Sequence, residues 1–163
     1  TGAQSDEAIW NFTSYAVESN PEIRIGLAFP WKDFPADYEN GTEYRNQTDW
    51  AYNSWVNLSL KLSREFPPAD VFTFHHGAVM YELRDMFEAG ELENDVEQLS
   101  GPESTSIFRD RKGHAGQIAI DTGALVWLHA IHGVDPLTMP EFTQWETDIR
   151  EVARKTIDEQ NSA

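Results

Sequence analysis

The stretch "VFTFHHGAVMYELRDMFEAG" (residues 71–90) decides the fold class. Its first six residues form a short, largely apolar run that ends at Gly77, which is typical of a buried strand. After that glycine, apolar residues such as Val79 and Leu83 recur at helical spacing, and Gly90 is expected to end the helix. Strands that alternate with helices in this way indicate an α/β fold with a parallel sheet.

The same alternation extends outward from this stretch. The remaining expected elements are a helix at 6–19, a strand at 23–29, a polar loop at 32–49, a helix at 49–65, a polar loop at 91–106, and helices at 115–131 and 141–161. This order predicts three α/β/α layers around a parallel sheet in a single domain, residues 1–163. Two strands are too few for a parallel sheet that helices cover on both faces. We therefore expect further strands, either unrecognised in this sequence or contributed by another segment or chain.

Composition and charge exclude several classes of function. The net charge of −16 repels nucleic acid and anionic lipid, so we predict neither nucleic acid nor a membrane as partner. No run of residues reaches the apolar length needed to cross a bilayer. The absence of cysteine excludes disulfides and thiolate catalysis. The first ten residues lack the basic and apolar regions of a signal peptide, and a soluble acidic chain in a secreted or periplasmic location remains compatible with the composition.

Candidate ligand-binding residues follow both predicted strands. In open α/β sheets, ligands bind at the carboxyl ends of the strands. Trp31 comes just after the first strand, where it either lines a pocket, as a sugar-stacking ring does, or fills the core. His75 and His76 end the second strand, and because adjacent strand residues point to opposite faces, we expect one of them to face a cleft.

A polar loop before the apolar helix supplies a candidate acid–base pair. The stretch "IFRDRKGHAG" (residues 107–116) places Asp110 four residues before His114. A histidine general base needs its second ring nitrogen held by another group, usually a carboxylate, and Asp110 is within reach. The alternative is that Asp110 is a turn residue and His114 caps the following helix. His129 and His132 are one helical turn apart, which is a weak metal signal, and we predict no metal and no cofactor.

The second half of the chain resembles the carboxyl-terminal region of SGNH (GDSL-like) hydrolases. The resemblance rests on "VFTFHHGAVMYELRDMFEAGEL" followed by "IFRDRKGHAGQIAIDTGALVWLHAIHGVDP", extends over residues 16–136, and is most specific at residues 108–116. It implies a three-layer α/β/α fold and ester hydrolysis by a serine nucleophile, a histidine base and an orienting aspartate. On this resemblance His114 is the base and Asp110 the orienting acid.

The chain departs from the family pattern in two places. The family usually has Asp three residues before His, where this sequence has Arg111. The nucleophile block and the two oxyanion blocks are missing. Ser5 does follow a glycine, Gly2, but no strand precedes it as the nucleophile block requires. The chain is therefore expected to be the carboxyl-terminal part of an SGNH-like domain, with the serine supplied by a second segment or chain.

Two hypotheses follow for function. The first is a serine esterase that acts on acyl esters of carbohydrates or small molecules, for which this chain supplies His114 and Asp110. The second is a binding or interaction module on a degenerate hydrolase scaffold, in which Trp31 and the acidic loop make the contacts. The missing serine and the position of Arg111 favour the second hypothesis.

Overall fold

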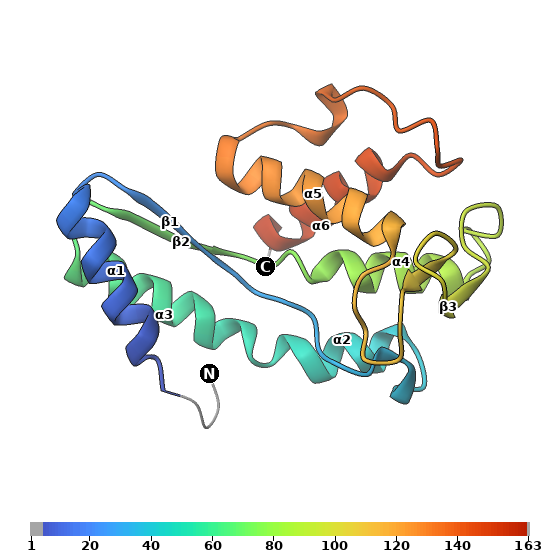
Figure 1. Ribbon diagram of the computed structural model, residues 1–163, viewed down its shortest axis with the longest axis horizontal. Helices are drawn as coiled ribbons and strands as arrows, with labels where there is room; N and C mark the ends of the chain where they lie inside the picture. Colours follow the sequence, from blue (N-terminus) through green and yellow to red (C-terminus); the bar gives the residue numbers. More distant parts are fainter. Residues whose placement is uncertain (1–4, 163) are drawn as a thin grey trace. The chain divides into compact units, whose positions relative to one another are not determined.

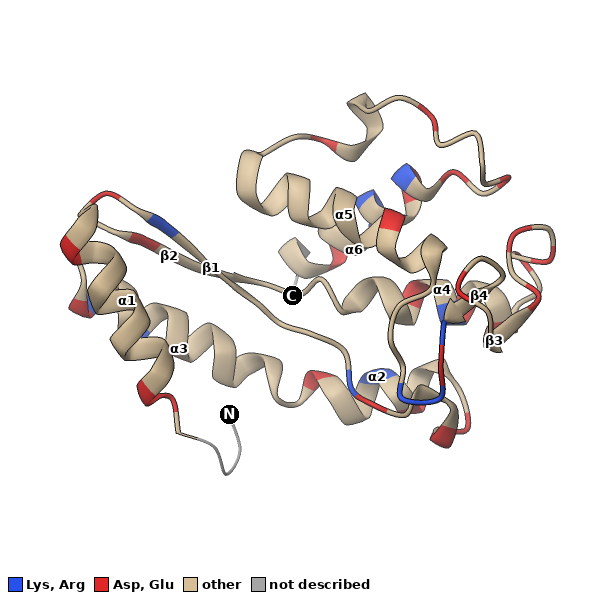
Figure 2. Ribbon diagram, in the orientation of Figure 1, with Lys and Arg blue, Asp and Glu red and all other residues tan. Residues whose placement is uncertain are grey.

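The computed structural model describes residues 5–162, and Gly2, the glycine that precedes Ser5, lies outside the described residues. The chain is a mixed α/β protein with two small parallel sheets (Figure 1), and acidic residues occur on most of its helices and loops (Figure 2). This confirms the α/β class and the parallel strands. No helix in the described part is both long enough and apolar enough to span a bilayer.

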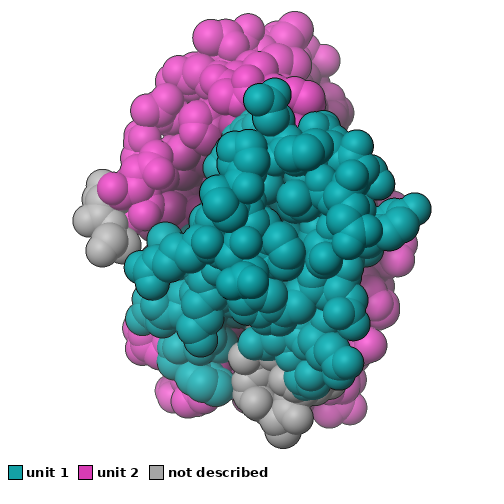
Figure 3. Space-filling model, turned by 90° about the vertical axis from the view of Figure 1, so that its left-hand side faces the viewer, with its two compact units in different colours: residues 1–29, 49–75 teal, residues 30–48, 76–163 magenta. Residues whose placement is uncertain are grey.

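The chain divides into two compact units, coloured separately in Figure 3. The first unit consists of residues 1–29 and 49–75, and the second unit of residues 30–48 and 76–163. Each unit is built from two separate segments of the chain.

The first unit is a two-stranded parallel sheet with two helices. It contains α1 (Glu7–Ser19), β1 (Arg24–Ala28), α3 (Tyr52–Glu65) and β2 (Asp70–Phe74). β1 and β2 pair in register from Arg24 opposite Asp70 to Ala28 opposite Phe74. Both helices turn apolar residues toward the strands. The core consists of Leu27, Leu58, Leu62, Ala69 and Val71, with Ile9, Trp10, Val17, Ile23, Ile25, Trp55 and Phe66 packed against it.

The second unit is mainly helical. It contains the 3₁₀ turns Pro35–Asp37 and Pro136–Thr138, α2 (Gly41–Asp49, whose last residue is in the first unit), α4 (Ala78–Glu88), β3 (Gln98–Ser100), β4 (Ser106–Phe108), α5 (Gln117–His132) and α6 (Ile149–Ser162). α4, α5 and α6 pack against one another (Figure 1), and β4 contacts both α4 and α5. β3 and β4 form the second parallel pair.

Two of the predicted polar loops contain regular structure that the sequence did not indicate. The loop at 32–49 contains α2, although the average residue of this helix is polar. Asn40 accepts a hydrogen bond from the backbone amide of Glu43, as an N-cap side chain does. Tyr44 is fully buried and donates its hydroxyl to the carbonyl of Lys32. Tertiary contacts of one side chain therefore stabilise a helix with little amphipathic pattern. The loop at 91–106 likewise contains β3 and the first residue of β4.

The last helix begins later than the predicted residue 141. Asp95 accepts hydrogen bonds from the backbone amides of Glu146 and Thr147 and holds that segment in a turn. Asp148 then caps α6, because its carboxylate accepts a hydrogen bond from the amide of Arg150.

Candidate functional site

The residues that follow β1 and β2 lie together. The rings of Trp31 and His76 have centroids 5.5 Å apart and are nearly perpendicular, at 79°. Gly77 allows the two segments to approach, because a Cβ at this position would lie 2.5 Å from the carbonyl carbon of Pro30 and from the amide nitrogen of Trp31. The backbone atoms at 30–31 leave no room for a side chain at residue 77, so the strand-to-helix turn needs glycine.

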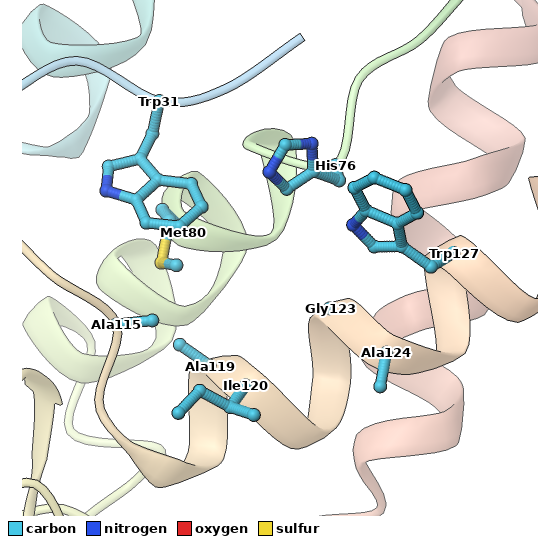
Figure 4. A pocket seen from close by; sticks show the side chains of 9 residues that line it. All are labelled: Trp31, His76, Met80, Ala115, Ala119, Ile120, Gly123, Ala124 and Trp127. Atoms are coloured by element: carbon cyan, nitrogen blue, oxygen red, sulfur yellow. The ribbon is translucent and has the colours of Figure 1, made fainter. Parts of the chain in front are cut away.

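Trp31 and His76 line a pocket in the second unit, which we call the aromatic pocket (Figure 4). Its volume is about 410 Å³, within the range of small-molecule sites. The remaining lining residues are Met80, Ala115, Ala119, Ile120, Gly123, Ala124 and Trp127. In Figure 4 the helix α5 forms one side, with Trp31 and Trp127 at opposite ends and His76 between the two indoles.

Two contacts fix the aromatic walls. The indole nitrogen of Trp31 donates a hydrogen bond of 2.7 Å to the carbonyl of Gly113. The ring of His76 lies 5.3 Å from that of Trp127, centroid to centroid, at a tilt of 56°. Edge and tilted contacts of this kind are the favourable geometry for aromatic pairs. The orientation of the walls is therefore set by the protein itself.

Trp127 is one of the pocket residues that sequence reasoning missed. Its helical spacing with other apolar residues is typical of core packing, yet 39% of it is exposed, as are 43% of Ile120 and 40% of Ile131. The available signal was the composition of α5, in which Asp121 is the single Asp, Glu, Lys or Arg residue (Figure 2). A helix that is apolar on all sides usually lies entirely in a core, so exposed apolar residues on it point to a pocket or an interface.

His75 lies elsewhere, among the residues of the first unit. It is only 3% exposed, and its Nε2 is 2.9 Å from Asp49 Oδ1. The rings of Phe29 and Tyr52 lie 4.7 Å and 5.0 Å from its ring. Of the two adjacent histidines, His76 lines the aromatic pocket and His75 is enclosed by aromatic rings, which is the division expected from strand alternation.

Asp110 and His114 form a hydrogen-bonded pair in the loop between β4 and α5. Asp110 Oδ2 is 2.5 Å from His114 Nδ1. Its other oxygen accepts hydrogen bonds from the backbone amides of Gly113 and His114, at 3.0 Å and 3.2 Å. Gly113 has a φ of +100°, a conformation that favours glycine. Asp110 is thus a turn residue as well as the partner of the imidazole.

The hydrogen bonds keep the carboxyl group of Asp110 ionised. The bond from His114 is the largest influence, and with the two backbone amides it lowers the pKa of Asp110 to about 2. An ionised carboxylate accepts only, so the His114 nitrogen that faces it, Nδ1, is the protonated one. In the neutral ring, Nε2 then carries the lone pair, which is the form a general base requires.

The loop that carries the pair is attached to β4 and to the aromatic pocket. The amide of Gly116 donates to the carbonyl of Ile107 at 2.7 Å, and Ala115 forms a bridge with Phe108. Gly116 is the N-cap of α5, so His114 does not cap that helix. Ala115 lines the pocket, and Gly113 accepts the Trp31 hydrogen bond. The acid–base pair and the pocket therefore share one short segment.

No serine is paired with His114 in the part of the chain that the structure describes. Among residues 5–162, the His114 ring makes its hydrogen bond with Asp110. Ser5 accepts a hydrogen bond from the amide of Glu7 at the start of α1. His129 Nδ1 lies 3.1 Å from the carbonyl oxygen of Val134. Within these described residues, no three histidine or carboxylate side chains are grouped as a metal site requires.

Comparison with known proteins adds no family to this picture. No family model matches the chain, and no curated protein or solved structure shows significant similarity to it.

Proposed function

We propose that this chain supplies the general base of a serine ester hydrolase of the SGNH (GDSL-like) type. The observation that supports it is the hydrogen bond between Asp110 Oδ2 and His114 Nδ1, on a side chain that is 53% exposed. Asp110 holds the ring in the tautomer whose Nε2 accepts a proton, and the exposure leaves the ring open to a reacting group.

In the proposed reaction His114 moves one proton twice. As a serine Oγ attacks the ester carbonyl, Nε2 takes the hydroxyl proton, and the imidazolium returns it to the leaving alcohol when the ester C–O bond breaks. In the second half, Nε2 takes a proton from a water molecule that attacks the acyl-serine. The proton then returns to the serine Oγ as the carboxylic acid leaves. The serine and the further strands of a three-layer α/β/α sheet are contributed by another segment or chain. The two-stranded size of each sheet in residues 5–162 supports this part of the proposal.

The substrate is an uncharged acyl ester of a carbohydrate or other small molecule. Trp31 and His76 contribute to binding of its apolar acyl part, rather than of a sugar ring, in the aromatic pocket. No Asp, Glu, Lys or Arg side chain lines that pocket, and the net charge of −16 disfavours anionic substrates.

A second candidate is a binding module without catalytic activity. The observation that favours it is an aromatic pocket of about 410 Å³ beside a histidine that has no serine partner among residues 5–162. Arg111, at the position where the family usually has Asp, favours it too.

The test is intact mass spectrometry of the native preparation after treatment with a fluorophosphonate. Esterase function predicts a covalent adduct on one serine, in this chain or in a companion polypeptide. His114→Ala should lower labelling and ester turnover by at least about 100-fold, the usual contribution of a general base. His132→Ala, an exposed histidine of α5 that does not line the pocket, is the matched control and should label normally. If no polypeptide is labelled and no ester is hydrolysed, the binding module replaces the esterase.

A further inference from the structure

We propose that the aromatic pocket is a site for an uncharged planar aromatic ring and that Gly123 determines how deeply the ring enters. In the proposed esterase this ring would be part of the substrate, and that assignment alone rests on the proposed function. Ring binding itself requires only the pocket.

The walls of the pocket have the chemistry of an aromatic site. Two indoles and an imidazole surround it, and these rings already contact one another in edge and tilted geometries. A planar ring that enters between them makes further contacts of the same kind. Met80 is buried and adds a thioether, which also contacts aromatic rings favourably. Because Trp31 is held by its hydrogen bond to Gly113, its ring loses little freedom when a ligand binds.

The same lining disfavours sugars and ions. A sugar ring carries several hydroxyl groups, each of which loses water on burial and needs a hydrogen-bond partner. No carboxylate, amide or hydroxyl side chain lines the pocket. A charged ligand finds no opposite charge there, so its desolvation is not compensated. An uncharged aromatic ring loses little favourable hydration when it enters the pocket.

Gly123 leaves space that the fold does not need. A Cβ at this position meets no described atom within 4 Å apart from the neighbouring residues and backbone of α5 itself, and glycine in a helix interior is less favourable than alanine. Gly123 lies in the interior of α5, one turn from both Ala119 and Trp127, which also line the pocket. A side chain here would extend into the pocket rather than into the core. The glycine thus weakens the helix and keeps the pocket deep.

The experiment is calorimetric titration of the protein with three uncharged probes of different shape. They are 2-naphthol, the aliphatic alcohol n-decanol and methyl β-glucopyranoside. We expect naphthol to bind most tightly. Gly123→Leu should weaken naphthol binding at least about tenfold by occupying the ring's space, and Gly123→Ala should weaken it less. His132→Leu adds the same side chain to the same helix at an exposed position outside the pocket and should leave binding unchanged.

Trp127→Leu provides an independent test if Gly123→Leu alters the fold, because it removes one aromatic wall that is 39% exposed. It too should weaken naphthol binding. The proposal is overturned if naphthol does not bind, if decanol or the glucoside binds more tightly than naphthol, or if Gly123→Leu and Trp127→Leu both bind naphthol as the native protein does. Calorimetry involves no turnover, so failure of ring binding and failure of serine labelling are separate results.

Discussion

At the scale of single residues, Asp110 combines two roles that sequence reasoning treated as alternatives. One carboxylate oxygen accepts hydrogen bonds from the backbone amides of Gly113 and His114 and so forms the turn. The other oxygen accepts a hydrogen bond from the His114 imidazole. The turn brings the histidine ring to the acid because both oxygens belong to one rigid planar group. A structural turn and a positioned base are therefore the same feature here.

The His114 ring should account for most of the shift in the pKa of Asp110. In His114→Ala the pKa should rise from about 2 toward the ordinary value of about 3.9, while the two backbone amides keep it somewhat below that value. The measurement is the ¹³C shift of the Asp110 carboxyl as a function of pH, with His132→Ala as control.

The lowered pKa of Asp110 determines how the stability of the fold changes with pH. Ionised Asp110 stabilises the folded loop above its unfolded pKa, and this contribution is lost as pH falls through about 2. At pH 3 the native carboxyl should still be mostly ionised and that of His114→Ala clearly less so. Identical titration curves for the two proteins would show that the imidazole contact is not formed in solution.

At the scale of elements, α5 and its N-cap have two glycines with opposite environments. Gly116, at its N-cap, is enclosed by backbone: a Cβ there would collide with the carbonyl oxygen of Ser106 and lie 3.0 Å from that of Ile107. Gly123, in the middle, has open space beside it. One glycine permits the close approach of α5 to β4, and the other has no role in packing.

Alanine at these two positions should change stability in opposite directions. Gly123→Ala should increase the free energy of unfolding by about 1 kcal/mol, because alanine is the better helix former. Gly116→Ala should decrease it by about 1–3 kcal/mol, because backbone atoms must move. Urea unfolding of both variants measures this. A destabilised Gly123→Ala would mean that the space beside α5 is closed in solution and would also count against the aromatic pocket.

The helix α4 carries a buried carboxylate that joins three helices of the second unit. The Glu82 side chain is 5% exposed and accepts from Arg45 of α2 at 2.9 Å and from Lys155 of α6 at 2.6 Å. Burial opposes its ionisation, but the hydrogen bonds from Lys155 and Arg45 outweigh burial and lower the pKa of Glu82. One turn along α4, burial raises the pKa of Asp85, which Arg45 only partly offsets.

Amide substitutions should therefore separate these two carboxylates. Glu82→Gln should destabilise the protein by about 1–3 kcal/mol at pH 7, because two cations lose their shared charged acceptor. Asp85→Asn should not destabilise it, because the fold disfavours the ionised form of Asp85. Guanidinium is unsuitable for the measurement because it screens charge, so urea unfolding is preferred.

The contribution of Glu82 also has a defined pH dependence. Because its folded pKa is depressed, the contribution is present above the unfolded pKa of about 4.3 and is lost as pH falls through the folded value. The gap in stability between the native protein and Glu82→Gln should thus stay constant from pH 7 down to about 4.3 and shrink at lower pH. A gap that does not shrink below about pH 4 would assign the effect of Glu82→Gln to packing rather than to charge.

At the scale of the whole molecule, acidic residues greatly outnumber basic ones. The chain has 28 Asp and Glu against 12 Lys and Arg, and Figure 2 shows acidic residues along most of the ribbon. Several of the basic residues are engaged more than once, as Arg45 is with Glu82, Asp85 and Glu159. Because negative charges are in excess, the carboxylates repel one another at long range.

Salt should therefore stabilise this protein. Raising NaCl from about 10 mM to about 150 mM shortens the Debye length from about 30 Å to about 8 Å and screens the long-range repulsion. We expect the midpoint of thermal unfolding to rise, with most of the rise in this range rather than above it. A fall over the same range would show that ion pairs such as Arg45–Glu82 contribute more to stability than repulsion subtracts.

The sequence by itself determined the elements whose pattern is local. Six of the expected helices and strands, including the strand and helix within residues 71–90, lie within a few residues of their predicted positions, because periodicity and the glycine and proline signals at their ends depend on near neighbours. The proximity of Asp110 and His114 was also local, since four residues separate them.

Only the tertiary structure decided the features that depend on distant residues. α2 forms because Tyr44 is buried and bonded to Lys32, and α6 starts late because Asp95 holds the preceding segment. The aromatic pocket joins Trp31 to Trp127, which nearly a hundred positions of chain separate. Neither periodicity nor composition encodes such a pairing, because its energy comes from packing and hydrogen bonds between segments that meet only in the folded chain.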